Sequence, residues 1–165
     1  MAEAMSLAGM TENPVVVHLA QRPGPATGLP TRTEQGDLNF ALHIGHGDFP
    51  RAILTPGTPE ECFACARKAF DLADKYQVPV IVMTDQFLLD AHAEASREVF
   101  EIIAKKPQKY FVPTSESYKR YAYTDDGLSP RGIPGFGQGF VHADSDEHDE
   151  DGRIIEDAET RTKMM

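Results

Sequence analysis

Two nearly continuous runs of apolar residues stand out along the chain, at positions 15–20 (VVVHLA) and 78–83 (VPVIVM). Both are rich in β-branched residues and neither alternates with polar positions, which is typical of parallel strands that are buried on both faces. A third run, at positions 51–55 (RAILT), is followed by a Pro-Gly pair that ends a strand. The pattern predicts three strands, the first and last of them fully buried.

The residues between the second and third strands follow a helical pattern. Thr58 is suited to cap this helix, Pro59 to occupy its first position, and Glu61 to complete a capping box. We expect the helix to end near Tyr76 and its apolar stripe to comprise positions 62, 66, 69, 73 and 76. Because a strand, a helix and a strand follow within about thirty residues, they predict a right-handed crossover and a parallel sheet.

Weaker signals mark the rest of the chain. We predict helices at positions 2–9, 38–43, 93–104 and 156–163. Beyond Lys105 the chain is expected to be irregular, because residues 129–140 (SPRGIPGFGQGF) are dense in glycine and proline. The predicted fold class is α/β with a parallel sheet. It is organised as an α/β domain over residues 1–104, followed by an irregular connector and acidic tail over residues 105–165.

Acidic residues are concentrated toward the end of the chain. The 165 residues include 26 acidic and 16 basic ones and carry a net charge of -10. Residues 142–165 hold nine of the acids and only three of the bases. An acidic chain without a basic stripe is a poor ligand for nucleic acid and for anionic membranes, so we expect neither partner. The longest apolar run is also far shorter than the roughly 20 residues of a membrane-spanning helix. Two cysteines make no disulfide scaffold, and we expect a reducing, cytoplasmic location.

Three groups of residues have types that bind metals or carry redox chemistry. Cys62 and Cys65 form a C-x-x-C pair, but they lie inside the predicted helix, which favours buried small side chains over a redox pair. His43 and His46 lack an obvious third metal ligand and are interpreted as loop histidines. The acidic stretch 144–152 departs from calcium-loop spacing, so we expect a solvated surface loop there.

A different prediction attaches to the long segment that follows the first strand. Arg22 comes two residues after the strand, where open parallel sheets place their ligands. A guanidinium held there is able to grip a carboxylate with two hydrogen bonds. Thr27, Thr31 and Thr33 would add hydroxyl groups. By these residues alone, a carboxylate site and an ordinary surface arginine remain equally good interpretations.

The run from Gln21 to Leu38 (QRPGPATGLPTRTEQGDL) resembles the signature of one family, the alpha subunits of 2-oxoacid:ferredoxin oxidoreductases, especially of the 2-oxoglutarate type. Further stretches continue the resemblance over nearly the whole chain, namely residues 41–51, 56–61, 84–86, 124–131 and 146–149. The resemblance implies part of a pyrimidine-binding domain of a thiamin diphosphate enzyme. It also implies that Arg22 grips the carboxylate of the substrate and that Thr31 helps to orient the 2-oxoacid.

The same resemblance implies an activity for the assembled enzyme. Such enzymes oxidatively decarboxylate a 2-oxoacid, form acyl-coenzyme A, and pass electrons through iron–sulfur clusters to ferredoxin. A beta subunit would supply the diphosphate and magnesium site together with a cluster. Because ferredoxins are typically acidic, we expect them to dock on that partner and not on residues 142–165.

Two features of the family are expected to lie before Met1: a Tyr-Pro-Ile-Thr-Pro segment and the glutamate that activates the aminopyrimidine. The chain is therefore expected to be the latter part of a pyrimidine-binding domain and to be inactive alone. A non-catalytic α/β module that binds or regulates other subunits is the alternative hypothesis. A thiol redox protein that works through Cys62 and Cys65 is a third.

Overall fold

The computed structural model describes residues 1–104 and 108–165. The chain divides into two compact units, Met1–Gln108 (unit 1) and Lys109–Met165 (unit 2), which are described separately below. Lys105, where the irregular region was expected to begin, lies outside the described residues. Within them, no helix is both long enough and apolar enough to cross a membrane.

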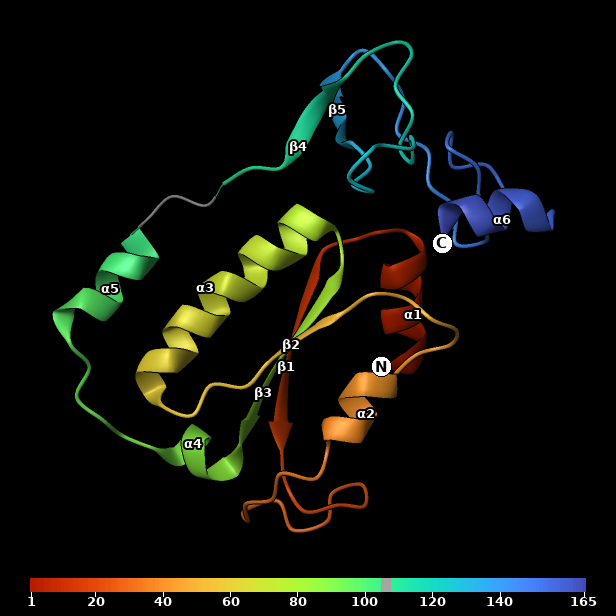
Figure 1. The fold of residues 1–165 in the computed structure, drawn as a ribbon. Helices are drawn as coiled ribbons and strands as arrows, with labels where there is room; N and C mark the ends of the chain where they lie inside the picture. The colour runs from red at the N-terminus through yellow and green to blue at the C-terminus, as the bar shows by residue number, and fades with distance from the viewer. Residues whose placement is uncertain (105–107) are drawn as a thin grey trace. The chain divides into compact units, whose positions relative to one another are not determined.

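Unit 1 is built on a three-stranded parallel sheet in the order β1-β3-β2 (Figure 1). The strands are β1 (Val15–Gln21), β2 (Ala52–Leu54) and β3 (Pro79–Asp85). Every residue of the central strand β3 is buried, as predicted. The prediction for β1 is wrong, because β1 is an edge strand whose residues are mostly half-buried or exposed.

Helices cover both faces of this sheet. On one face, α1 (Ala2–Met10) and α2 (Leu38–His43) enclose an apolar cluster that includes Met5, Ile81 and Met83. On the other face, α3 (Pro59–Tyr76) packs Ala69 and Ala73 against alternate residues of the strands. Figure 1 shows α3 on one side of the sheet and α1 and α2 on the other. The α/β class and the parallel sheet are therefore confirmed. So are the helices predicted at positions 2–9 and 38–43 and the capped helix predicted to end near Tyr76.

The start of α3 follows the predicted capping scheme with one difference. Thr58 Oγ1 accepts a hydrogen bond from the amide of Glu61 at 3.1 Å. The Glu61 carboxylate, however, accepts from the amide of Gly57 at 2.7 Å, one residue before the cap. The prediction of the apolar stripe is partly wrong, because two of its five positions are exposed: Ala66, and Tyr76 with 42% of its surface accessible. Ala69 and Ala73 are the buried residues of α3 that face the sheet, and their small side chains let the helix pack closely against it.

The helix predicted over residues 93–104 is shorter and is preceded by a separate one. Asp85 caps α4 (Gln86–Asp90), and α5 (Arg97–Ala104) follows after an irregular connection. The Glu60 carboxylate accepts a hydrogen bond from the amide of Ser96 at 2.8 Å. This contact fixes the residue just before α5. Because its partners lie 36 positions apart, no local sequence pattern could have predicted it.

Unit 2 contains two strands in a region that was expected to be irregular. The strands β4 (Phe111–Thr114) and β5 (Arg131–Gly137) pair in parallel, and α6 (Ala158–Met164) follows as predicted. Proline is tolerated in β4 because Pro113 lies at the register shift between its two neighbours. A Cβ atom on Gly137 would lie 2.3 Å from the carbonyl oxygen of Thr114, so glycine permits the strands to approach.

Candidate functional site

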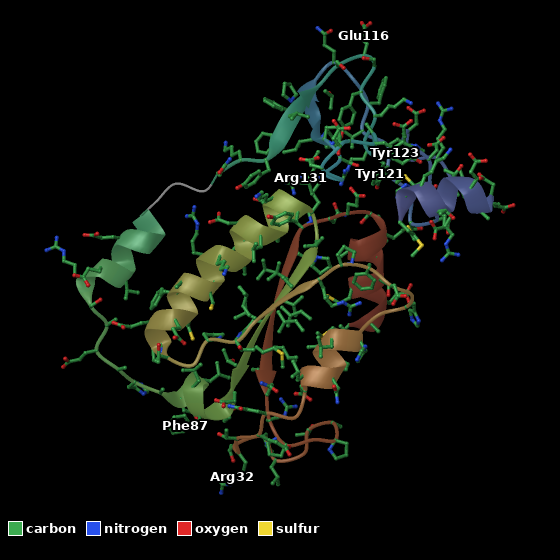
Figure 2. All side chains as sticks on the ribbon, viewed as in Figure 1. Arg32, Phe87, Glu116, Tyr121, Tyr123 and Arg131 are labelled. Atoms are coloured by element: carbon green, nitrogen blue, oxygen red, sulfur yellow. The ribbon has the colours of Figure 1, made fainter. Side chains whose placement is uncertain are left out.

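The strands of unit 1 end around a pocket of about 370 Å³. The carboxyl ends of β1, β2 and β3 meet there with the start of α4, at the end of a parallel sheet where ligands bind in open α/β folds (Figure 1). Arg32 and Phe87, both labelled in Figure 2, lie at this same end of unit 1. The pocket is lined by Gln21, Gln35, Thr55, Pro56, Gly57, Met83, Thr84, Asp85, Phe87 and Leu88.

Gln21, the last residue of β1, connects this strand to its neighbour and to the loop beyond. Its side chain is only 7% exposed. The amide nitrogen donates to the carbonyl oxygen of Thr84 at 3.3 Å, and the amide oxygen accepts from the backbone amide of Asp37 at 3.1 Å. A long polar side chain is stable in this buried position because both of its ends are hydrogen-bonded.

Asp85, the last residue of β3, holds two segments with one carboxylate. Oδ1 accepts from the amide of Leu88 at 2.8 Å, which caps α4, and Oδ2 accepts from Nε2 of Gln35 at 2.8 Å. The hydrogen bond from Gln35, followed by that from Leu88, lowers the pKa of Asp85 below its ordinary value. Asp85 is therefore an ionised acceptor whose two oxygens are both in use.

Residues 22–34 form an exposed turn between these anchors, which we name the Arg22 loop. Arg22 Nε donates to the carbonyl oxygen of Thr27 at 3.0 Å, and the amide of Leu29 donates to the carbonyl oxygen of Pro23 at 3.0 Å. The first contact uses one of the five N–H groups of the guanidinium, and its planar end remains suited to a carboxylate. A backbone turn thus presents the predicted cation.

The three threonines that were predicted to add hydroxyl groups to the site make no hydroxyl contact with Arg22 among the described residues. Thr31 and Thr33 are exposed, and Thr27 contributes its carbonyl oxygen, not its hydroxyl, to Arg22. Arg32 Nη1 lies 3.5 Å from the carbonyl oxygen of Thr31. Among the described residues, no hydrogen bond joins the side chains of Arg22 and Thr31, so the structure brings both into one exposed loop without pairing them.

Sequence reasoning missed three residues of the site: Gln21, Gln35 and Asp85. For Gln21 and Asp85 a signal existed, because each is a polar residue directly after an apolar strand at the edge that binds ligands. Gln35 had none, since its partner lies 50 positions away.

The other candidate groups gain no support. Cys62 and Cys65 are free and half-buried, and burial, then the neighbouring Cys65 and Glu61, raise the pKa of the Cys62 thiol. A raised pKa is the opposite of what a redox thiolate needs. His46 lies 3.6 Å from Glu3 on the surface. No cluster of three or more His, Cys, Asp or Glu side chains able to hold a metal ion occurs among the residues that the structure describes.

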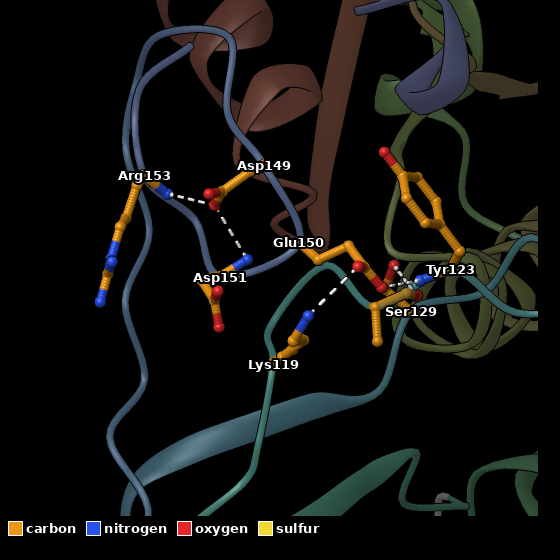
Figure 3. Close-up of polar contacts among 8 residues, drawn as sticks. Lys119, Tyr123, Ser129, Asp149, Glu150, Asp151 and Arg153 are labelled. Carbon is orange, nitrogen blue, oxygen red and sulfur yellow. Dashed lines mark hydrogen bonds and ion pairs between the residues drawn. The ribbon is translucent and has the colours of Figure 1, made fainter. Parts of the chain in front are cut away.

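In residues 144–155 of unit 2, which we name the acidic turn, the carboxylates of Asp149 and Glu150 are hydrogen-bonded to other groups of unit 2 (Figure 3). Asp149 Oδ1 accepts from the amides of Asp151 and Arg153, both at 2.9 Å. Glu150 accepts from the amide of Tyr123 at 3.1 Å and from Nζ of Lys119 at 3.2 Å. These contacts make the stretch a folded turn instead of the solvated surface loop that was expected.

The composition of the pocket limits which group it can hold. Its lining has neutral amides and hydroxyls, apolar walls from Met83, Phe87 and Leu88, one carboxylate, and neither lysine nor arginine. Such a lining fits a flat heteroaromatic ring with polar edges and does not fit a diphosphate, which needs cations or metal ligands. Of the two ends of the thiamin diphosphate that the resemblance implies, the lining is therefore compatible with the pyrimidine ring and not with the diphosphate.

Taken together, the sheet edge and its anchored cationic loop define a ligand-binding α/β domain. All 165 residues match the family described as pyruvate flavodoxin/ferredoxin oxidoreductase, thiamine diphosphate-binding, and the chain belongs to that family. This confirms the resemblance and the fold class that the loop motif implied.

Named relatives place the chain more closely. It is 42% identical to the alpha subunit of 2-oxoacid:ferredoxin oxidoreductase 1 of Sulfurisphaera tokodaii, over 99% of this chain and 26% of that protein. It is 38% identical to the 2-oxoglutarate oxidoreductase subunit KorA of Mycobacterium tuberculosis, over 81% of this chain and 20% of that protein. The chain thus spans about a quarter of the length of the first of these relatives.

A solved structure agrees with these relatives. The 2-oxoglutarate:ferredoxin oxidoreductase of Magnetococcus marinus, which has 2-oxoglutarate, coenzyme A and succinyl-CoA bound, superimposes with a TM-score of 0.87. The superposition covers 99% of this chain and 28% of that one, at 35% identity. The fold of this chain is therefore that of a segment within the larger enzyme.

Proposed function

We propose that the chain is the substrate-recognising portion of the alpha subunit of a thiamin diphosphate-dependent 2-oxoacid:ferredoxin oxidoreductase. The assembled enzyme would oxidatively decarboxylate a 2-oxoacid such as 2-oxoglutarate to the acyl-coenzyme A, with ferredoxin as electron acceptor. The observation that carries the proposal is that Arg22, held by a backbone turn, directly follows Gln21, which lines the pocket at the carboxyl edge of the sheet. Family membership and the named relatives support the chemistry.

Arg22 would bind a carboxylate of the substrate. A 2-oxoacid carries a planar carboxylate, and a guanidinium matches its two oxygens with two parallel N–H groups. Thr31, in the same loop, would orient the 2-oxoacid through its hydroxyl. The bound ligands of the Magnetococcus marinus relative favour 2-oxoglutarate as the substrate.

The cofactor would be shared between this chain and a partner. Met83, Phe87 and Leu88 would form the walls of the space for the pyrimidine ring, because the apolar part of the pocket lining fits such a ring. When bound, thiamin diphosphate supplies the carbanion chemistry that lets a 2-oxoacid lose CO₂. The diphosphate, its magnesium ion and an iron–sulfur cluster would be held by a beta subunit. The pocket lining has no lysine or arginine for the diphosphate and no cysteine for a cluster, and both oxygens of its one carboxylate are already hydrogen-bonded.

The remaining partners follow from the proposed reaction. Coenzyme A would accept the acyl group, and ferredoxin would collect the electrons at the beta subunit, away from the acidic residues 142–165. We place the enzyme in the cytoplasm, where its two free cysteines would stay reduced. Neither nucleic acid nor a membrane is expected as a partner.

The test is kinetic and uses the complete alpha subunit co-purified with its beta subunit. Arg22→Ala is expected to raise the KM for 2-oxoglutarate. It should also lower kcat/KM by a factor that corresponds to a loss of about 2–4 kcal/mol in transition-state stabilisation, as for the loss of one partner of a desolvated charge pair. Arg32→Ala removes a cation from the same loop and is the matched control, with a change below about 0.5 kcal/mol. Unchanged kinetics in Arg22→Ala would refute the assignment.

A further inference from the structure

The Arg22 loop lies on the surface of unit 1. Every residue from 24 to 36 is exposed, and so is Arg22 itself. The hydrogen bonds within the loop hold its turn together, yet they do not fix the turn relative to the pocket. Whatever orients the guanidinium must therefore act at the ends of the loop.

Two contacts fasten the far end of the loop to the ends of two strands. Gln35 Nε2 donates to Asp85 Oδ2 at 2.8 Å, across 50 positions of the chain. Two residues later, the amide of Asp37 donates to the buried amide oxygen of Gln21 at 3.1 Å. We name the Gln35–Asp85 contact the loop latch, because it joins the residue directly after the Arg22 loop to the last residue of β3.

The acceptor of the latch is well fixed. Asp85 is 9% exposed, and its other oxygen caps α4, whose residues Phe87 and Leu88 line the pocket. The two hydrogen bonds also hold its pKa below the ordinary value, so the carboxylate stays charged near neutral pH. A hydrogen bond to a charged acceptor is stronger than one between neutral groups, which suits an anchor for an exposed loop.

We propose that Gln35 and Asp85 are positioning residues: their contact fixes the Arg22 loop against the sheet edge and so holds the guanidinium where it meets the carboxylate of the substrate. This inference rests on the proposed function of Arg22 as the carboxylate-binding residue. Neither Gln35 nor Asp85 is required to touch the substrate. The gain is preorganisation, because a loop held in its binding geometry loses less entropy when the ligand arrives.

A simpler interpretation gives Asp85 the single role of capping α4, with Gln35 as an incidental neighbour. The two interpretations differ for Gln35→Glu, which places two carboxylates in contact and leaves the cap intact. They differ again for the exchanged pair Gln35→Glu with Asp85→Asn. There the asparagine oxygen still caps α4, and its amide group can donate to the new glutamate.

The experiment uses the complete alpha subunit with its beta subunit and 2-oxoglutarate as the probe. Gln35→Glu is expected to raise the KM about 10-fold to 100-fold with kcat within about threefold, as for a misplaced binding group. The exchanged pair is expected to restore the KM to within about threefold of the original. Gln86→Glu is the matched control, because it breaks a similar amide–carboxylate contact, with Asp90 at 3.0 Å, that does not involve the loop.

Hydrogen exchange gives a readout that does not depend on catalysis. In Gln35→Glu the backbone amide of Asp37 is expected to exchange about tenfold faster, and in the exchanged pair at the original rate. Gln35→Ala, which removes the bond without opposing charges, serves if Gln35→Glu fails to assemble. An unchanged KM in Gln35→Glu, beside a raised KM in Arg22→Ala, overturns the latch alone. An unchanged KM in Arg22→Ala overturns the proposed function on which the latch rests.

Discussion

The Arg22 loop and the acidic turn are both irregular and both carry charged side chains, but they use their charged groups in opposite ways. In the acidic turn, Asp149 and Glu150 each accept two hydrogen bonds from their own surroundings. In the Arg22 loop, the contact from Nε to the carbonyl oxygen of Thr27 is the one hydrogen bond of the guanidinium among the residues that the structure describes. The carboxylates of the acidic turn hold unit 2 together, whereas the cation of the Arg22 loop is proposed to bind a ligand. Charge density in a sequence thus says little about binding until the partners of each charge are known.

The largest expected effect comes from reshaping the Arg22 loop. Gly28 has φ +51°, and a Cβ atom there would lie 1.8 Å from the carbonyl oxygen of Pro23, which accepts the bond that closes the turn. Gly28→Ala is therefore expected to lower kcat/KM for 2-oxoglutarate about 100-fold in the assembled enzyme. The midpoint of thermal unfolding should change little, because the loop is exposed.

Gly24→Ala is the matched control for this substitution. A Cβ atom at Gly24 would meet its nearest neighbour at 3.9 Å, an ordinary contact, so kcat/KM is expected to stay within about threefold. Equal losses in both variants would mean that the loop tolerates no side chain at all, and the argument from the turn geometry would fail.

A smaller effect is expected in the acidic turn, and on stability instead of binding. Glu150→Ala removes the acceptor of the Tyr123 amide and the partner of Lys119, and is expected to cost about 1 kcal/mol in the free energy of unfolding. Four of the five tyrosines lie in unit 2, so near-ultraviolet circular dichroism during urea unfolding would measure this loss of stability. Glu116→Ala, which removes an exposed carboxylate of the same unit, should cost less than about 0.5 kcal/mol.

Acid should abolish the difference between Glu150→Ala and the original protein. The hydrogen bond from the Tyr123 amide, then that from Lys119, lowers the pKa of Glu150 in the folded state. Its stabilisation is therefore fully present above the ordinary pKa of 4.5 and is lost as the pH falls through the folded-state value. A difference that persisted at still lower pH would assign the effect of Glu150 to packing and not to its charge.

Periodicity predicted the elements whose stability is local or whose burial is complete. The capped helix α3 and the central strand β3 are of this kind: Thr58 caps one, and apolar residues fill the other. The exposed edge of β1 was not predictable, because the order of strands in a sheet decides which of two similar apolar runs is central.

Unit 2 shows the limit of reasoning from composition. Glycine and proline between residues 129 and 140 predicted irregular structure, yet β5 forms there. Gly137 is needed for the close approach to Thr114, and the hydroxyl of Tyr118 accepts from the amide of Gly132 at 2.6 Å. Both contacts join residues far apart along the chain, so the same glycines that signal a loop locally serve a strand in the folded unit.

The site was predictable to a similar extent. The sequence indicated Arg22 as a candidate cation, because it follows a strand at the edge where parallel sheets bind ligands, and its binding role stays a prediction. The anchors of Arg22 could not be predicted, since Gln35 and Asp85 meet only after the sheet has formed. Residues that hold a binding group in place leave little local signal, because their partners are chosen by the fold.

The most direct test of the central claim is chemical rescue of Arg22→Ala by guanidinium ion in the assembled enzyme. If Arg22 binds the carboxylate of the 2-oxoacid, millimolar guanidinium should refill the vacated position and raise kcat/KM for 2-oxoglutarate at least about tenfold. Ammonium ion, which lacks the planar fork, should rescue less, and Arg32→Ala should not respond to either. Failure of guanidinium to raise kcat/KM in a correctly assembled Arg22→Ala enzyme would contradict the account.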